Sequence, residues 1–269
     1  SLGTLIPPSI FLIVYGSATE SSIAELFMGA FLPGIILAVI LTIYAYLYAK
    51  KNDFPVKEAV PFKKKLETYK EGIWALLMPI VILGGIFLGI FTATEAAAVS
   101  AIYAWLVSAF IYKEMNGMDL VGILKESAIS TAALVVLVGF SKVSSWVIVT
   151  SKFPDAILNA FTSISSSSVG ILLLLNILLI IVGMFMEGNA AIVMLTPLIL
   201  PLLNTYGISK ITFGIVMAMN LSLGLVTPPV GSCLLLANQM AEAKLGMTLK
   251  KVLVPVVLWI AALLLTTYF

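Results

Sequence analysis

Long apolar runs alternate with short polar stretches along almost the whole chain. A helix needs about 20 apolar residues to cross the hydrocarbon core of a bilayer. The pattern therefore predicts an all-α, polytopic membrane protein. Its predicted apolar segments are 5–15, 23–49, 72–91, 94–112, 127–150, 169–186, 190–203, 211–226, 230–242 and 250–268.

Several of these segments are too short to cross a bilayer alone. The segments 169–186 and 190–203 join through Glu187-Gly188-Asn189, which is too short for an ordinary loop between full spans. They predict a re-entrant hairpin over 169–203 with a polar tip. The segments 211–226 and 230–242 predict one crossing that is broken at Thr227-Pro228-Pro229.

One motif occurs twice, each time with a glycine four residues before a proline pair. The copies are Gly3-Thr4-Leu5-Ile6-Pro7-Pro8-Ser9 and Gly224-Leu225-Val226-Thr227-Pro228-Pro229-Val230-Gly231. A proline pair cannot continue a helix, because it removes backbone donors and clashes with the preceding turn. In transporters, matched broken segments mark the ion and substrate site. The alternative is a pair of proline kinks that bind nothing.

Lysine-rich stretches set the orientation, since short loops rich in lysine stay in the cytoplasm. The stretch 50–71 holds seven lysines and four acidic residues, and Lys250 and Lys251 mark another such loop. The stretch 113–126 predicts a short interfacial connector on the same side. From these anchors the first broken segment runs outward and the second runs inward, as an inverted repeat requires.

These features predict four parts. Residues 1–49 end a first inverted repeat, with a broken helix at 1–15 and a helix at 23–49, and residues 50–71 form a cytoplasmic loop. Residues 72–126 hold connecting helices and the interfacial connector. Residues 127–269 form a second repeat. Because the chain starts inside a motif and without methionine, we expect it to be the C-terminal part of a longer permease.

Composition narrows the function further. Hydrophobic residues make up 61% of the chain and charged residues 10%, with no histidine, no arginine and one cysteine. The lack of histidine excludes a Ser-His triad, a His zinc site and a His proton relay. No nucleotide-binding loop is present. We expect no enzyme activity and no nucleic-acid partner.

The two breaks carry the chemistry that we expect. Unwound backbone exposes carbonyl oxygens, which are hard ligands for a small cation, and Thr227, Thr4 and Ser9 add hydroxyls. The half-helix after each break starts with free N–H groups and a positive dipole end, which attract an anion. One break can therefore hold a cation on one side and a carboxylate on the other.

Three further polar positions have two interpretations each. Glu187 is either a functional intramembrane carboxylate or a solvated residue at a wet tip. Glu95 follows Thr92 and Thr94, so the group either binds substrate or caps a helix. Lys142 attracts an anionic substrate, pairs with Glu95 or Glu187, or lies in a wet crevice.

The order of four motifs, GTLIPPSI, FTATEAAAVSAIYA, MEGNAAIVMLTPLILP and GLVTPPVG, resembles the large membrane subunit of tripartite ATP-independent periplasmic (TRAP) transporters. The resemblance implies uptake of an organic acid across the bacterial inner membrane, driven by a sodium gradient. It implies two partners, a small four-helix membrane subunit and a periplasmic substrate-binding protein. It also implies a scaffold and a moving transport domain that work as an elevator.

The resemblance also implies where ions bind. It points to Gly3, Thr4 and Pro7 for one sodium ion, and to Gly224, Thr227 and Pro228 with the tip residues Glu187, Gly188 and Asn189 for another. The residues expected at the substrate are Ser9, Thr94, Glu95, Asn189, Pro229 and Gly231. Members of the family carry C4-dicarboxylates, sialic acid and other carboxylates, and we favour sialic acid.

Three rival functions stay open at this point. A proton-coupled transporter would use Glu187 or Glu95 as its proton carrier and would work without sodium. A passive channel would not accumulate its substrate. An intramembrane enzyme would turn over a product in detergent, without an ion gradient.

Overall fold

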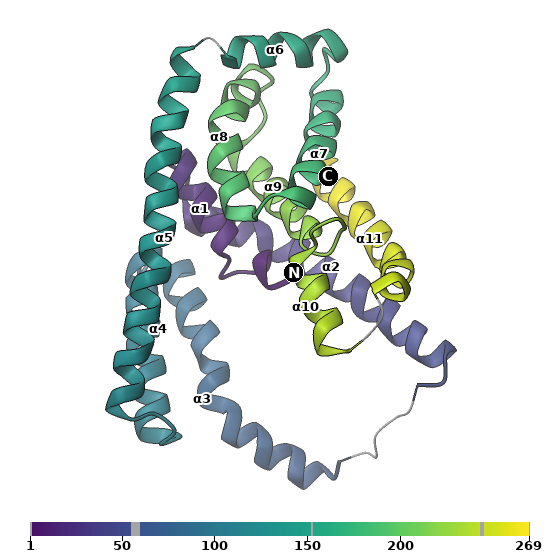
Figure 1. Cartoon of the computed structure of the whole chain (residues 1–269). Helices are drawn as coiled ribbons and strands as arrows, with labels where there is room; N and C mark the ends of the chain where they lie inside the picture. The colour runs from purple at the N-terminus through teal and green to yellow at the C-terminus, as the bar shows by residue number, and fades with distance from the viewer. Residues whose placement is uncertain (1, 55–59, 152, 243–244, 269) are drawn as a thin grey trace. The chain divides into compact units, whose positions relative to one another are not determined.

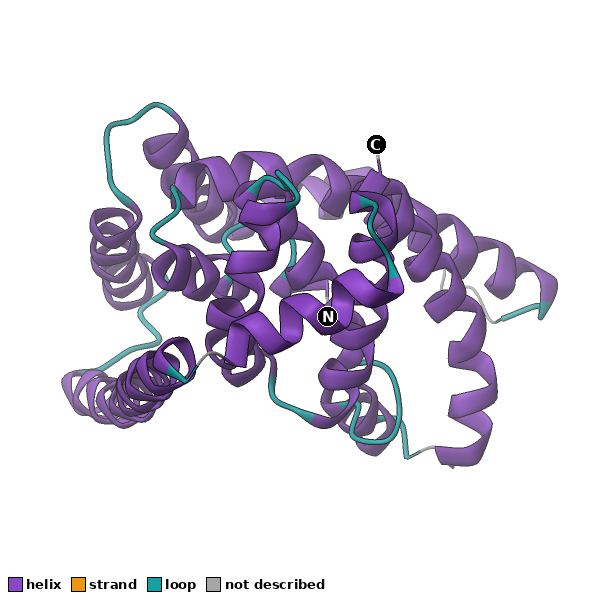
Figure 2. Ribbon diagram, turned by 90° about the horizontal axis from the view of Figure 1, so that it is seen from above, coloured by secondary structure: helices purple, strands orange, loops and turns teal. Residues whose placement is uncertain are grey.

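The computed structural model describes residues 2–54, 60–151, 153–242 and 245–268, and the regular elements in those ranges are all helical (Figures 1 and 2). After the short 3-10 turn η1 (Leu2–Thr4), the helices are α1 (Ile10–Thr19), α2 (Ile23–Lys51), α3 (Phe62–Phe87), α4 (Ala93–Leu106) with the π-helical extension η2 (Val107–Ile111), α5 (Gly117–Thr150), α6 (Phe153–Ile164), α7 (Ser168–Phe185), α8 (Gly188–Thr205), α9 (Lys210–Gly224), α10 (Ser232–Met240) and α11 (Leu245–Tyr268).

The chain divides into two compact units. Unit 1 consists of residues 1–47 and 137–269, and unit 2 consists of residues 48–136. Both breaks and the helices α7 and α8 therefore belong to unit 1, although more than a hundred residues separate the two breaks in sequence. The candidate ion site is built within this unit.

Helix α9 is the centre of unit 1. All its residues from Phe213 to Gly224 are buried, which is typical of a helix that is covered on every side. It packs against α1, α7, α8 and α11 (Figure 1). The indole Nε1 of Trp259 on α11 donates to the carbonyl oxygen of Met219 at 3.2 Å.

A buried polar cluster ties α9 to two neighbours. The amide of Asn220 donates to Asn176 Oδ1 on α7 at 2.7 Å, and Asn176 Nδ2 donates to Thr267 Oγ1 on α11 at 3.3 Å. All three side chains are buried. Hydrogen bonds between polar side chains of neighbouring helices help to hold helices together in membranes.

Helices α1 and α9 run antiparallel. Tyr15, in the middle of α1, donates its hydroxyl proton to the carbonyl oxygen of Lys210 at the start of α9, at 2.9 Å. Thr4, ahead of α1, instead contacts Ser222 near the end of α9. As the residue number rises in the first segment, the partner's number falls. This arrangement is what opposite directions of the two broken segments require.

Unit 2 is held by contacts between α3 and α4 with its extension. The hydroxyls of Tyr103 and Tyr112 donate to the carbonyl oxygens of Trp74 and Glu71, at 2.7 and 2.8 Å. Gly85 on α3 allows the ring of Phe91 to pack closely, since a methyl group there would collide with it. The two helices therefore form a close antiparallel pair.

Two polar stretches are more helical than the sequence predicted. Within 50–71, predicted as a cytoplasmic loop, α2 continues to Lys51 and α3 begins at Phe62. Lysine, glutamate and leucine are strong helix formers, and they dominate residues 62–71. Within the predicted connector 113–126, α5 already begins at Gly117. There Asn116 Oδ1 accepts from Met118 and Asp119 N–H, at 2.9 and 3.0 Å, and starts the helix.

The other boundaries lie close to the predicted ones, with two differences. Helix α1 begins at Ile10 rather than residue 5, because Ser9 caps it. Helix α6 was not predicted at all. Seven helical segments in the described ranges are long and apolar enough to cross a membrane. The fold is therefore that of an all-α polytopic membrane protein.

Candidate ion and substrate site

The first break lies between η1 and α1. The Ser9 hydroxyl donates to the carbonyl oxygen of Thr4 and accepts from the N–H of Leu12 at 3.3 Å, so it joins the unwound segment to the first turn of α1. Pro7 is buried, Gly3 is exposed, and the Pro7-Pro8 peptide bond is cis. The backbone of this break is therefore fixed by a buried hydroxyl.

The second break lies between α9 and α10, and carbonyl groups at both of its edges have hydrogen-bond partners. The carbonyl oxygens of Leu223 and Gly224 accept from the Thr227 hydroxyl and N–H, at 2.7 and 3.1 Å. The Pro228-Pro229 bond is also cis, Pro229 is exposed, and Gly231 turns the chain with φ +43°. Because the Thr227 hydroxyl donates its proton to Leu223, its oxygen lone pairs point away from that bond and are suited to a cation.

The start of α10 differs from the prediction of free N–H groups. The N–H groups of Cys233 and Leu234 both donate to the carbonyl oxygen of Leu225, at 3.0 and 3.3 Å. The chain reverses so tightly between α9 and α10 that a carbonyl of the break lies over the first turn of the next helix. These two donors are therefore not available to an anion.

The hairpin tip joins α7 to α8 through Met186 and Glu187. The Glu187 carboxylate accepts from the N–H groups of Asn189 and Ala190, at 3.0 and 2.9 Å, and so caps α8. Asn189 Nδ2 also donates to Glu187, at 3.0 Å. The other amide atom, Asn189 Oδ1, is buried and has no hydrogen-bond partner among the described residues.

The tip lies against the helix that follows the first break. Gly188 is buried, and a methyl group added to it would meet the ring of Phe11, with Cε1 only 2.7 Å away. Only a glycine permits this approach. The tip predicted to serve the second break therefore also contacts the helix that follows the first break.

The end of α7 contacts the second break directly. Gly224 faces the backbone of Gly183, and a methyl group on Gly224 would lie 2.7 Å from Gly183 Cα and closer still to its carbonyl group. The N–H of Val230 donates to the carbonyl oxygen of Met184 at 3.3 Å. Small residues let helix backbones approach closely in membranes. The hairpin therefore contacts the second break and the helix that follows the first break.

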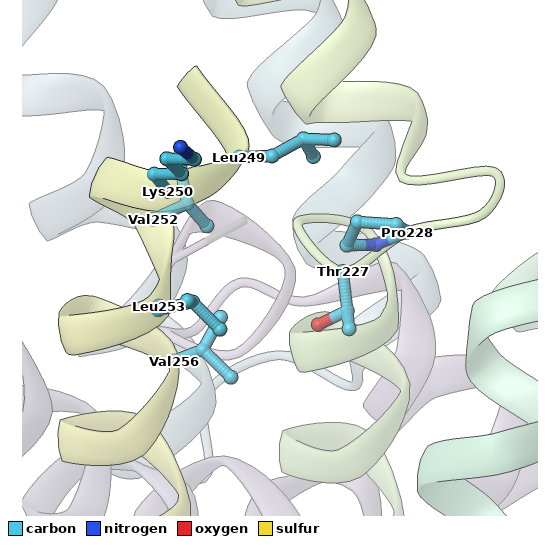
Figure 3. Close-up of a pocket in the computed structure, with 7 residues that line it drawn as sticks. All are labelled: Thr227, Pro228, Leu249, Lys250, Val252, Leu253 and Val256. Carbon is cyan, nitrogen blue, oxygen red and sulfur yellow. The ribbon is translucent and has the colours of Figure 1, made fainter. Parts of the chain in front are cut away.

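A cavity of about 220 Å³ lies between the second break and α11 (Figure 3). Thr227 and Pro228 line one side, and the other side is formed by residues of α11, namely Leu249, Lys250, Val252, Leu253 and Val256. Figure 3 shows the nitrogen of Lys250 turned away from Thr227. With an almost wholly apolar lining, this cavity does not suit a carboxylate.

Thr94 and Glu95 belong to unit 2, whereas both breaks and the hairpin belong to unit 1. Thr92 caps α4 in a reciprocal arrangement, in which Glu95 Oε2 accepts from the Thr92 N–H at 2.8 Å and Thr92 Oγ1 accepts from the Glu95 N–H. The structure thus shows the capping interpretation of this group. A role of Thr94 and Glu95 at the substrate stays a prediction.

Lys142 lies outside the side chains that the structure describes.

Sequence reasoning overlooked two contributors to the site, Ser222 and Phe11. Ser222 is completely buried, and its Oγ lies 2.6 Å from Thr4 Oγ1. A polar residue inside an apolar helix, two positions before the glycine of the motif, is the signal that points to Ser222.

An all-α membrane protein with two antiparallel broken segments that meet a helical hairpin belongs to the class of inverted-repeat secondary transporters. Comparison with known proteins gives the family. The family model described as "Tripartite ATP-independent periplasmic transporter, DctM component" matches residues 1–269. The chain therefore belongs to the large-permease family of TRAP transporters.

Individual relatives agree with this assignment. The chain is 37% identical to the isethionate TRAP transporter permease protein DctMQ of Oleidesulfovibrio alaskensis, over all of this chain and 42% of the relative. It is 36% identical to the C4-dicarboxylate TRAP transporter large permease protein DctM of Pseudomonas aeruginosa, over all of this chain and 63% of the relative. Against the sialic acid TRAP transporter large permease protein SiaM of Vibrio cholerae, identity is 33% over 90% of this chain and 56% of the relative.

These relatives are permeases and not enzymes, as predicted. The chain spans between 42 and 63% of the length of the three relatives. The activity of the whole protein is therefore a matter for proposal.

Proposed function

We propose that this chain forms the ion- and substrate-binding part of a permease that couples the uptake of a small organic anion to sodium entry across the bacterial inner membrane. The observation that carries the proposal is Asn189 Oδ1, a buried carbonyl oxygen without a partner among the described residues. A buried polar atom without a partner is costly. A sodium ion, which prefers hard oxygen ligands, removes that cost.

The surroundings of Asn189 favour a cation over a proton. Both oxygens of Glu187 accept hydrogen bonds from groups of α8, and acceptors of this kind are typical of an ionised helix cap. Because Glu187 serves as the helix cap, the oxygen ligands that we propose for sodium are Asn189 Oδ1, Thr227 Oγ1 and Thr4 Oγ1. A proton-coupled mechanism that uses Glu187 would instead weaken these bonds whenever the carboxyl group is protonated, because hydrogen bonds to a charged acceptor are the stronger ones.

We propose that the substrate is an organic anion held mainly by hydroxyl groups and helix starts, because the chain has no arginine to bind a carboxylate in a bidentate way. Relatives named for isethionate, C4-dicarboxylates and sialic acid are similar to this chain at 33–37% identity. These identities are too similar to favour one anion, so sialic acid is one of three candidate substrates.

We further propose that unit 1 is the moving transport domain of an elevator and that unit 2 belongs to the scaffold. In support, both breaks and the hairpin lie in residues 1–47 and 137–269. The proposed partners are a small membrane subunit and a periplasmic binding protein, as the family name implies.

The test is uptake into proteoliposomes that contain the full-length permease and both partners. Labelled isethionate, succinate and sialic acid are supplied in parallel, with and without an inward sodium gradient at fixed pH. Accumulation of one anion that needs both sodium and the binding protein is the expected result. Accumulation that survives without sodium would refute sodium coupling, and equilibration without accumulation would indicate a channel.

A variant pair then tests the ligand itself. Asn189→Leu keeps the size of the side chain but removes Oδ1, so the sodium concentration for half-maximal uptake should rise about tenfold, the factor that corresponds to 1.4 kcal/mol. Asn204→Leu, at the exposed end of the same helix, is the matched control and should behave like the wild type. An unchanged sodium requirement in Asn189→Leu would exclude this oxygen as a ligand.

A further inference from the structure

We infer that Ser222 is a positioning residue that couples the two broken segments, so that sodium binding at the first break favours sodium binding at the second. The inference rests on the sodium coupling proposed above and adds a residue and a regulatory link to it. Its basis is the contact between the hydroxyls of Thr4 and Ser222, which are 218 positions apart in sequence.

The contact is short, and one of its two side chains is fully buried. The two hydroxyl oxygens are 2.6 Å apart, and Ser222 is 0% exposed. Ser222 lies on α9, two residues before the glycine at which the second break begins. Thr4 lies in the first break, and its carbonyl oxygen accepts from Ser9, which caps α1. Two hydrogen bonds, one to the backbone and one to the side chain of Thr4, therefore link the start of α1 to the end of α9.

A bound cation would set which of the two hydroxyl groups donates the hydrogen bond. A hydroxyl group has one proton and two lone pairs, so in the absence of an ion either Thr4 or Ser222 can donate to the other. An oxygen that coordinates a cation must use a lone pair for it, and its proton then points away. Sodium at Thr4 Oγ1 would therefore make Thr4 the donor and Ser222 the acceptor. Hydrogen bonds from polarised donors are also stronger.

The end of α9 transmits this bond to the second break. Gly224, two residues after Ser222, packs against the backbone of Gly183, and Val230 donates to Met184 in the same hairpin. A stronger bond to Ser222 holds α9 in the position that keeps these contacts. Sodium at the first break therefore prepares the second break and the hairpin tip, which is positive cooperativity between two sites.

The experiment measures uptake against sodium concentration in full-length permease with both partners. We expect a Hill coefficient above 1 for the wild type. Ser222→Ala should lower it towards 1 and raise the half-saturating sodium concentration about fivefold or more. Ser100→Ala is the matched control, because Ser100 is a buried serine that bonds only within its own helix, to the carbonyl oxygen of Ala97. It should leave both values unchanged.

Changes at Thr4 test the same bond from its other side. Thr4→Val keeps the shape and removes the hydroxyl, so it should lower the Hill coefficient as Ser222→Ala does, and the double variant should be no worse in cooperativity than either single one. Thr4→Ser retains a hydroxyl and should have a higher Hill coefficient than Thr4→Val. Sodium-induced thermal stabilisation of the purified variants gives a second readout that does not need transport.

The outcomes distinguish failure of the proposed sodium coupling from failure of the role of Ser222. If wild-type uptake does not depend on sodium, the proposed function fails and this inference fails with it. If the wild type is cooperative but Ser222→Ala keeps the full Hill coefficient, sodium coupling stands and the role of Ser222 is overturned. A Ser222→Ala variant that loses stability but keeps cooperativity in the protein that folds would show a purely structural role.

Discussion

The close approach of α7 and α9 makes Gly224→Ala the sharpest test of the site's architecture. A methyl group on Gly224 would lie 2.7 Å from the Cα atom of Gly183. Carbon atoms attract each other best at about 3.5–4.0 Å, so the two backbones must separate. No side-chain rotation can relieve this collision, because the obstacle is backbone.

Two opposing terms set the size of the effect. Overpacking of this kind costs about 1–3 kcal/mol. Alanine favours a helix over glycine by up to about 1 kcal/mol, which offsets part of that cost. A net loss of about 1–2 kcal/mol lowers the melting temperature by about 2–8 °C in a chain of roughly 150–250 residues, and by less in the longer full-length permease.

The assay is thermal unfolding of the purified full-length permease, followed by uptake in proteoliposomes. Gly122→Ala is the control, because Gly122 lies within helix α5 and a methyl group there meets no atom within 4 Å. This control should melt at the wild-type temperature or slightly above it. If Gly224→Ala does the same, the contact between Gly183 and Gly224 is wrong.

Three further changes probe the tip and the breaks. Gly188→Ala should reduce uptake strongly, because the new methyl group meets the ring of Phe11. Adding Phe11→Leu should restore part of the uptake, and a lack of rescue would contradict the contact. Glu187→Ala should lower the free energy of unfolding by about 0.5–2 kcal/mol through loss of the α8 cap, as measured by thermal unfolding. Sodium-driven uptake should persist in Glu187→Gln, and loss of that uptake would favour the proton-coupled rival. Thr227→Ala should raise the sodium requirement of uptake while leaving the fold largely intact, and an unchanged requirement would remove Thr227 from the ligands.

The sequence determined the membrane class, most helix positions and the two breaks. Apolar runs predicted the long helices because the hydrocarbon core leaves few alternatives to a helix. Proline pairs predicted the breaks because they remove backbone donors wherever they occur. Helix α6 and the early start of α5 were not predicted, because they depend on helix capping and on an amphipathic pattern that covers only a few turns.

Only the tertiary structure decided which polar groups meet. That Asn189 Oδ1 is buried without a partner, that Gly188 faces Phe11, and that Thr4 contacts Ser222 all depend on the packing of α1, the hairpin and α9. One local feature also escaped sequence analysis: the carbonyl oxygen of Leu225 occupies two N–H groups at the start of α10, against the expectation of free donors. Local backbone chemistry acts over a few residues and can be predicted from the chain, whereas contacts between positions about 200 residues apart arise only when the helices pack together.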